Sequence, residues 1–177
     1  YTPEEKNTDL DTGKPVYHEC PNGDVEDIEW MRASASIPVA SRPVMLGGKR
    51  LLDGGVSDPI PVKWMLSRGY EKNVVVLTRD VKYRKKANPK MQLFLKAVLH
   101  KYPAFLKDLE ERHIHYNETL QELVSLEKEG RVHIIRPSSP IQAAMIERDE
   151  SNLERIYQTG RADMKKDLEK LKAYLDS

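Results

Sequence analysis

Short apolar runs separated by turn residues mark the first 80 residues of the chain. Lys14 to Glu19 has the mixed pattern of an edge strand, and Val74 to Thr78 is a β-branched run typical of a buried strand. Asp24 can cap a helix, because apolar residues follow it at helical spacing: Val25, Ile28 and Met31. Gly47-Gly48 separates two apolar segments and predicts a tight hairpin. Strands that alternate with helices in this way predict an α/β sheet.

Within the first 80 residues, Pro61 also begins a short helix that Gly69 ends. Beyond residue 80, helical patterns dominate. From about residue 90, apolar residues recur at spacings of three and four until Gly130. Arg131 to Arg136 predicts one short strand, and Asp149 to Leu175 returns to a helical pattern. We therefore expect residues 1–80 to carry the α/β part of the fold and residues 81–177 to form a mainly helical region with one strand.

Composition restricts the classes of function. The formal net charge is +1 and the isoelectric point is about 8.0, which argues against a dedicated nucleic-acid-binding protein. No apolar run has the length of a membrane span, and the first residues lack a hydrophobic signal core. A single cysteine, Cys20, cannot form an intrachain disulfide. These features predict a cytoplasmic protein whose oligomeric state stays open.

Asp53-Gly54-Gly55 is the first candidate for chemistry. Asp53 ends a predicted strand, and two glycines can let another group approach the backbone closely or adopt positive φ. A carboxylate at the end of a strand in an α/β sheet lies where such folds commonly place catalytic groups. From the triplet alone, an ordinary turn in which Asp53 binds nearby backbone N–H groups is the alternative.

The surroundings of this triplet resemble the patatin-like phospholipases, a family of lipid acyl hydrolases. Three motifs carry the resemblance, in the expected order: Arg32-Ala33-Ser34-Ala35-Ser36-Ile37-Pro38, Asp53-Gly54-Gly55 and Pro59-Ile60-Pro61. Thr8 to Tyr17 is similar to the segment that precedes them in bacterial members. The tail around Arg148 to Gly160 is similar to that of a bacterial subgroup.

The resemblance implies a Ser-Asp dyad and a three-layer α/β/α domain followed by a helical extension. Asp53 would accept the proton of the serine that attacks a lipid or other ester, with Gly54 and Gly55 positioning it. Asp58 would instead cap the helix that begins near Pro59 to Pro61. The resemblance implies neither calcium nor another cofactor, and we expect no metal.

The chain departs from the family pattern at the nucleophile. It contains no Gly-x-Ser-x-Gly elbow and no glycine-rich oxyanion loop. Because the chain also begins with Tyr1, we expect it to be the C-terminal part of a hydrolase, inactive alone and dependent on an N-terminal segment that carries the serine. The alternative is a non-catalytic helical interaction module in which Asp53-Gly54-Gly55 is only a turn.

Other polar residues receive structural interpretations. Ser34 and Ser36 lack flanking glycines and are expected to bond the local backbone. His113 and His115 point to different faces of a helix, which disfavours a shared metal, and the three other histidines are isolated in sequence. Cys20 has no neighbouring base in sequence and is interpreted as an ordinary loop cysteine.

A basic run precedes an apolar group near the middle of the chain. The basic residues are Lys82, Arg84, Lys85, Lys86 and Lys90, and the apolar ones are Met91, Leu93, Phe94 and Leu95. A solvated connector is one interpretation. A peripheral contact with an anionic membrane surface is the other, because basic residues beside an amphipathic helix are attracted to such a surface.

Overall fold

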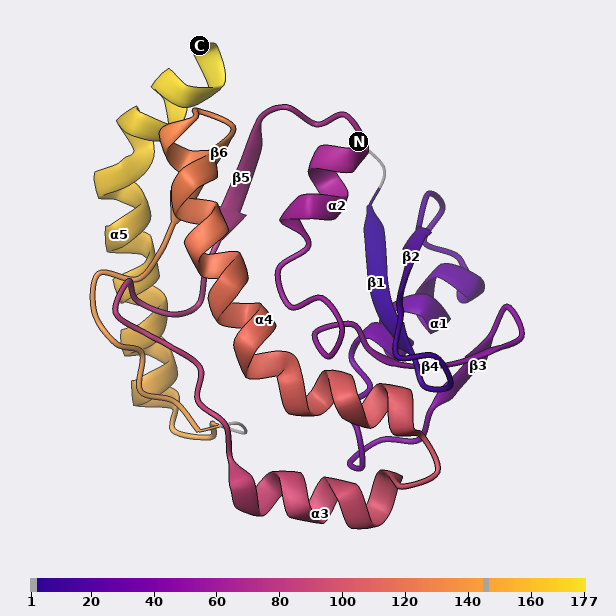
Figure 1. Cartoon of the computed structure of the whole chain (residues 1–177). Coiled ribbons are helices and arrows are strands. Elements are labelled where there is room, and N and C mark those ends of the chain that lie inside the picture. Colours follow the sequence, from indigo (N-terminus) through magenta and orange to yellow (C-terminus); the bar gives the residue numbers. More distant parts are fainter. Residues whose placement is uncertain (1–2, 145–146) are drawn as a thin grey trace. The chain divides into compact units, whose positions relative to one another are not determined.

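The computed structural model describes residues 3–144 and 147–177 (Figure 1). The chain folds as two compact units, each built from two segments of the sequence. The first unit contains Tyr1–Ile60 and Lys85–Glu118, and the second contains Pro61–Arg84 and Thr119–Ser177. The mixed α/β class expected from the sequence is confirmed, and the three-layer arrangement stays a prediction.

A four-stranded antiparallel sheet forms the centre of the first unit. Its strands are β1 (Glu4–Asp9), β2 (Pro15–Glu19), β3 (Val44–Leu46) and β4 (Lys49–Asp53). They lie in the order β2-β1-β4-β3, so that β1 pairs with both β2 and β4. The β3–β4 hairpin turns at Gly47-Gly48, as predicted. Both glycines have positive φ, +55° and +72°, which a two-residue turn of this kind requires.

Helix α1 (Val25–Ser34) begins at the predicted cap, where the Asp24 side chain accepts a hydrogen bond from the Asp27 backbone N–H at 3.0 Å. The helix does not bury the apolar residues that indicated it: Val25, Ile28 and Met31 are all exposed. It buries Asp27, Trp30 and Ala33 instead. The spacing predicted the helix correctly, but which of its faces packs on the sheet was decided by tertiary contacts.

Strand β4 is buried on both of its faces. Adjacent residues of a strand point to opposite faces, and Leu51 and Leu52 accordingly belong to different core clusters. The cluster on the Leu51 face includes residues of α1 and the neighbouring strands: Cys20, Trp30, Ala33 and Val44. Both faces of the sheet are therefore closed by apolar contacts.

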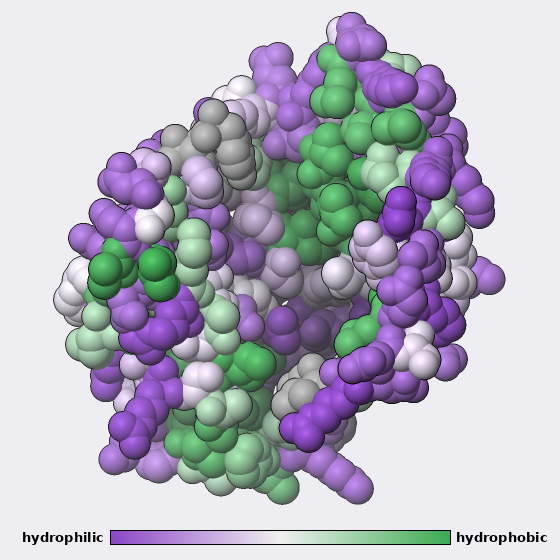
Figure 2. All heavy atoms as spheres, turned by 180° about the vertical axis from the view of Figure 1, so that it is seen from behind, coloured by the Kyte–Doolittle hydropathy of each residue, from purple (hydrophilic) through white to green (hydrophobic). Residues whose placement is uncertain are grey.

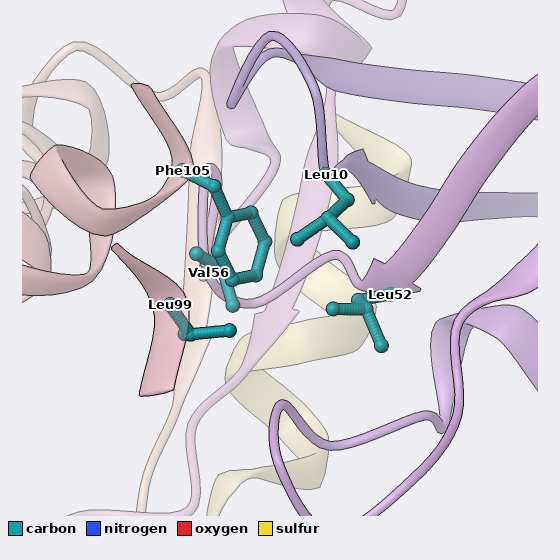
Figure 3. Packing of buried hydrophobic residues seen from close by; sticks show 5 residues of the cluster. All are labelled: Leu10, Leu52, Val56, Leu99 and Phe105. Atoms are coloured by element: carbon teal, nitrogen blue, oxygen red, sulfur yellow. The ribbon is translucent and has the colours of Figure 1, made fainter. Parts of the chain in front are cut away.

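Helices α3 (Pro89–Leu99) and α4 (Pro103–Lys128) supply the cluster on the Leu52 face. Figure 3 shows Phe105 of α4 directed toward Leu10 and Leu52, with Val56 and Leu99 completing the cluster. Phe105 is fully buried. The start of α4 is thereby fixed to the strand that ends at Asp53.

The second unit contains a parallel pair of strands, β5 (Asn73–Val76) and β6 (Val132–Ile135), with helices α2 (Val62–Ser67) and α5 (Glu150–Asp176). β5 is not the buried strand predicted from its sequence, since Val74 and Val76 are 41% and 69% exposed. In the described structure β5 pairs with β6 alone, and a two-stranded sheet leaves much of its surface open to solvent.

The second unit also holds an apolar groove of about 330 Å³ between the ends of β5 and β6 and one side of α5. α5 buries none of its residues fully, although apolar side chains recur along it. Apolar residues are gathered in groups on the surface shown in Figure 2. Within the described residues, no helix combines the length and hydropathy needed to cross a membrane.

The two phenylalanines of the chain provide a test of this packing. Phe105→Ala should lower the free energy of unfolding by about 3–5 kcal/mol, because it leaves a cavity against Leu52. Phe94→Ala, at a side chain that is half exposed, should cost well under half of that. Urea denaturation followed by circular dichroism measures both, and equal losses would contradict the packing described for Phe105.

Candidate active site

Asp53 is the last residue of β4, and its backbone is fixed on two sides. Its N–H donates to the Ser36 carbonyl oxygen at 2.8 Å, and its own carbonyl oxygen accepts from the Thr8 hydroxyl at 2.9 Å. Thr8 is fully buried and also lies 2.9 Å from the Ser57 hydroxyl. The position of the Asp53 backbone is therefore set by residues distant in sequence.

The Asp53 carboxylate is half-buried and points toward the turn that follows it. Its Oδ1 atom accepts a hydrogen bond from the Gly55 N–H at 2.7 Å. Among the described residues, its Oδ2 atom accepts no hydrogen bond, so one carboxylate oxygen remains available for another donor. This arrangement includes the turn predicted from the triplet, since the carboxylate does bond the local backbone.

Gly54 is needed for close approach rather than for positive φ. Neither Gly54 nor Gly55 has a positive φ, so their backbone conformations do not require glycine. A Cβ atom at Gly54 would lie 2.2 Å from the Lys6 carbonyl oxygen. Real Cβ atoms do not approach oxygen so closely, and β1 therefore leaves no room for a side chain at this position.

Arg112 of α4 holds the other side of the turn. Its Nε atom donates to the Gly55 carbonyl oxygen at 2.5 Å. A charge-assisted bond to a backbone oxygen is stronger than a neutral one, and it restrains the peptide group two residues beyond Asp53. The turn is thus bounded by β1 on one side and by α4 on the other.

Two cations and two carboxylates lie near one another around this turn. Burial lowers the pKa of Lys6, while the nearby charges of Asp58 and Asp53 act in the opposite direction and that of Arg112 lowers it further. Lys6 is thus close enough to both carboxylates for their charges to act on it. The turn combines acidic and basic groups in a partly desolvated setting, which is common at functional sites.

Asp58 does not cap the following helix as expected. α2 begins after Pro61, and within the described residues no side chain caps it with a hydrogen bond. The Asp58 carboxylate instead accepts a hydrogen bond from the Tyr17 hydroxyl at 2.5 Å. Burial and this bond raise the pKa of the Tyr17 phenol well above its usual value. The prediction was wrong because Tyr17 of β2, 41 residues away in sequence, lies close enough to bind the Asp58 carboxylate.

Asn7 is the most unusual polar residue near Asp53. It is fully buried and directly opposite Asp53 in the pairing of β1 with β4. Both polar atoms of its side chain lack a hydrogen-bond partner among the described residues. A buried amide without partners costs about 1–3 kcal/mol, so the structure keeps an unsatisfied group beside the candidate carboxylate.

Residues 3–65 match the patatin-like phospholipase family. This patatin-like segment contains the sheet, α1 and Asp53, and the family is one of lipid hydrolases. Residues 102–176 match a domain of unknown function, DUF6363. No curated protein matches the chain.

The two matched regions meet within the first unit. Arg112 and Phe105 belong to the DUF6363 region, whereas Gly55 and Leu52 belong to the patatin-like segment. Tyr102 adds a further link, since its hydroxyl accepts a hydrogen bond from Arg50 at 3.1 Å. The DUF6363 region thus contributes directly to the surroundings of the Asp53 turn.

Sequence reasoning did not place four residues near the Asp53 turn: Lys6, Asn7, Tyr17 and Arg112. Strand register could have indicated Asn7, which faces Asp53, and Tyr17, which pairs with Lys6. No sequence signal connects Arg112 with Gly55, because their contact depends on where α4 crosses the sheet.

Ser36 and His113 both bond their local backbone. The Ser36 hydroxyl donates to the Arg32 carbonyl oxygen at 2.8 Å, and Nδ1 of His113 lies 2.9 Å from the Glu110 carbonyl oxygen. Cys20 differs from expectation, because it is buried in a core cluster rather than in a polar loop. Burial also raises the pKa of its thiol.

Two glycine substitutions test the close approach at the turn. Gly54→Ala should lower the free energy of unfolding by about 1–3 kcal/mol, because the new Cβ collides with the Lys6 backbone. Gly160→Ala is the matched control in α5, where a Cβ meets no atom within 4 Å, and it should raise stability by about 0.5–1 kcal/mol. Chemical denaturation measures both, and an unchanged midpoint for Gly54→Ala would refute the steric explanation.

Proposed function

We propose that Asp53 is the catalytic carboxylate of a Ser-Asp dyad in a lipid acyl hydrolase. The nucleophile elbow and the oxyanion loop would lie outside this chain, which would form the C-terminal part of a three-layer patatin-like domain. One observation carries the proposal: the half-buried Asp53 carboxylate is held at the end of β4 by the Gly55 N–H, with Oδ2 left open. The match of residues 3–65 to the patatin-like family supports it.

The geometry suits proton transfer by one carboxylate. Oδ2 of Asp53 would accept the serine proton as the serine oxygen attacks the ester carbonyl. The proton would then pass to the departing alcohol, leaving the acyl group on the serine, and water would release the acid by the reverse sequence. Oδ1, bonded to Gly55, would keep the carboxylate oriented throughout.

The serine of the proposed dyad would come from a segment outside this chain. Because the chain contains no Gly-x-Ser-x-Gly motif, we propose that it is inactive alone toward lipid or other ester substrates.

Replacement of Asp53 tests the dyad in a protein that also contains the serine segment. Asp53→Asn keeps the size of the side chain but removes the proton acceptor, and kcat/KM for a p-nitrophenyl ester should fall about 100- to 10,000-fold. Asp58→Asn is the matched control, since Asp58 lies in the same loop but bonds Tyr17, and its effect should be less than about tenfold.

Similar losses for both variants would contradict a specific role for Asp53. Unchanged turnover for Asp53→Asn would reject the dyad and favour the non-catalytic interaction module. Circular dichroism of each variant separates a catalytic loss from unfolding.

We further propose that α3 contacts an anionic membrane surface. Met91, Leu93 and Phe94 are 50%, 72% and 50% exposed, and Lys86 and Lys90 beside them are exposed as well. Leu95, predicted to join this surface, is instead half-buried and packs on the core. Such a helix would place its apolar side chains in the interface while its lysines meet the lipid phosphates.

Vesicle binding tests this contact in the chain itself. Combined replacement Lys86→Gln and Lys90→Gln should weaken binding to vesicles rich in anionic lipid about 30-fold, at about 1 kcal/mol for each lysine near the surface. Lys165→Gln with Lys170→Gln changes the net charge equally on α5 and should have little effect. Cosedimentation measures both, and equal weakening would show that net charge alone drives binding.

A further inference from the structure

Three potential metal ligands from separate positions in the sequence converge beside α1. His18 is the second-last residue of β2, Cys20 directly follows that strand, and Asp27 lies in the first turn of α1. One ligand atom of each lies within 4.8 Å of the ligand atoms of the other two. We expected no metal from the sequence, in which His18 is isolated from other histidines and Cys20 has no neighbouring base.

Strand geometry explains the first half of this convergence. Residues two apart in a strand point to the same face, so His18 and Cys20 share a side of β2 and of its extension. The Cys20 N–H donates to the Pro3 carbonyl oxygen at 2.7 Å, which continues the pairing with the segment before β1. Cys20 has no adjacent base in sequence, but the fold places its sulfur near the His18 imidazole.

Asp27 is oriented by its own hydrogen bonds. Its Oδ2 atom accepts from the N–H groups of Asn22 and Gly23 at 2.8 and 2.7 Å. Its Oδ1 atom faces Nε2 of His18 at 3.8 Å. That separation is too long for a hydrogen bond, but it is close to the distance of about 3.4 Å between nitrogen and oxygen ligands of one tetrahedral Zn²⁺.

The surroundings favour a defined site over a chance surface cluster. Cys20 and Asp27 are each only 3% exposed. The His18 ring stacks on Trp30, with centroids 4.1 Å apart and planes at 9°, which restrains the imidazole. The His18 side chain is 30% exposed, so a cation could enter from solvent and keep a fourth position open.

We propose that His18, Cys20 and Asp27 bind a Zn²⁺ ion. One imidazole nitrogen, one sulfur and one carboxylate oxygen are ligands that zinc accepts together, and the sulfur disfavours Mg²⁺ and Ca²⁺. The Asn22 and Gly23 N–H groups orient the Asp27 carboxylate by donating to its other oxygen, Oδ2. The ion joins β2 to α1 on the side of the sheet that carries Leu51.

Cobalt and zinc titrations of the metal-free chain test the site. Cys20 is the only cysteine, so a thiolate-to-cobalt charge-transfer band must come from it. We expect that band with Co²⁺, one saturable Zn²⁺ site in competition with a chromogenic chelator, and loss of both in Cys20→Ser. His18→Phe keeps an aromatic ring on Trp30 but removes the nitrogen ligand. Loss of a group that only orients a ligand weakens metal affinity about 10- to 100-fold, so loss of a ligand itself should weaken Zn²⁺ binding at least as much.

His115→Gln is the matched control, because His115 is exposed and lies 3.6 and 3.4 Å from the carboxylates of Glu111 and Glu118. It should bind Zn²⁺ as the parent chain does. A folded parent chain without the cobalt band, or zinc affinity that falls in His115→Gln but not in His18→Phe, would overturn the proposal. Circular dichroism checks each fold, and if Cys20→Ser unfolds, the parent spectrum and His18→Phe decide.

Discussion

The pairing of β1 with its two neighbours is the constraint on which the candidate site depends. β1 places Asn7 opposite Asp53 on one side and Lys6 opposite Tyr17 on the other. It also supplies the Thr8 hydroxyl that holds the Asp53 carbonyl and the Lys6 carbonyl that excludes a side chain at Gly54. A shift of one residue in this register would turn these side chains to the opposite face of the sheet.

The second constraint is the packing of α4 on the same strand. Phe105 fills the Leu52 face of β4, and two turns later Arg112 reaches the Gly55 carbonyl. The apolar contact fixes the helix, and the helix then fixes the guanidinium. This gives part of the DUF6363 region a physical role, since it supports the turn that follows Asp53 in the patatin-like segment.

The Leu51 face of the sheet, opposite to the Leu52 face that α4 covers, carries different chemistry. Trp30 of α1 packs with Cys20 and Leu51 there, and Cys20 is also one of the proposed zinc ligands. An ion there would hold α1 to β2 through His18, Cys20 and Asp27. The proposed hydrolase site and the proposed metal site therefore make separate claims, and either can fail without the other.

Local sequence patterns were enough to predict where several helices and turns lie and to single out the Asp53 triplet. Asp24, Gly47-Gly48 and Gly130 correctly marked a helix start, a hairpin and a helix end, because capping and positive φ are local properties. Motif order also led to the patatin-like family, which is confirmed for residues 3–65. The role of Asp53 in catalysis stays a proposal.

Tertiary structure alone decided which faces and partners those elements acquired. α1 buries Trp30 rather than Ile28, β5 remains exposed, and Asp58 bonds Tyr17 instead of capping α2. The meetings of Arg112 with Gly55 and of His18 with Asp27 likewise join residues that no short-range pattern connects. Local propensity depends on neighbours in sequence, whereas burial and pairing depend on how the strands and helices pack in space.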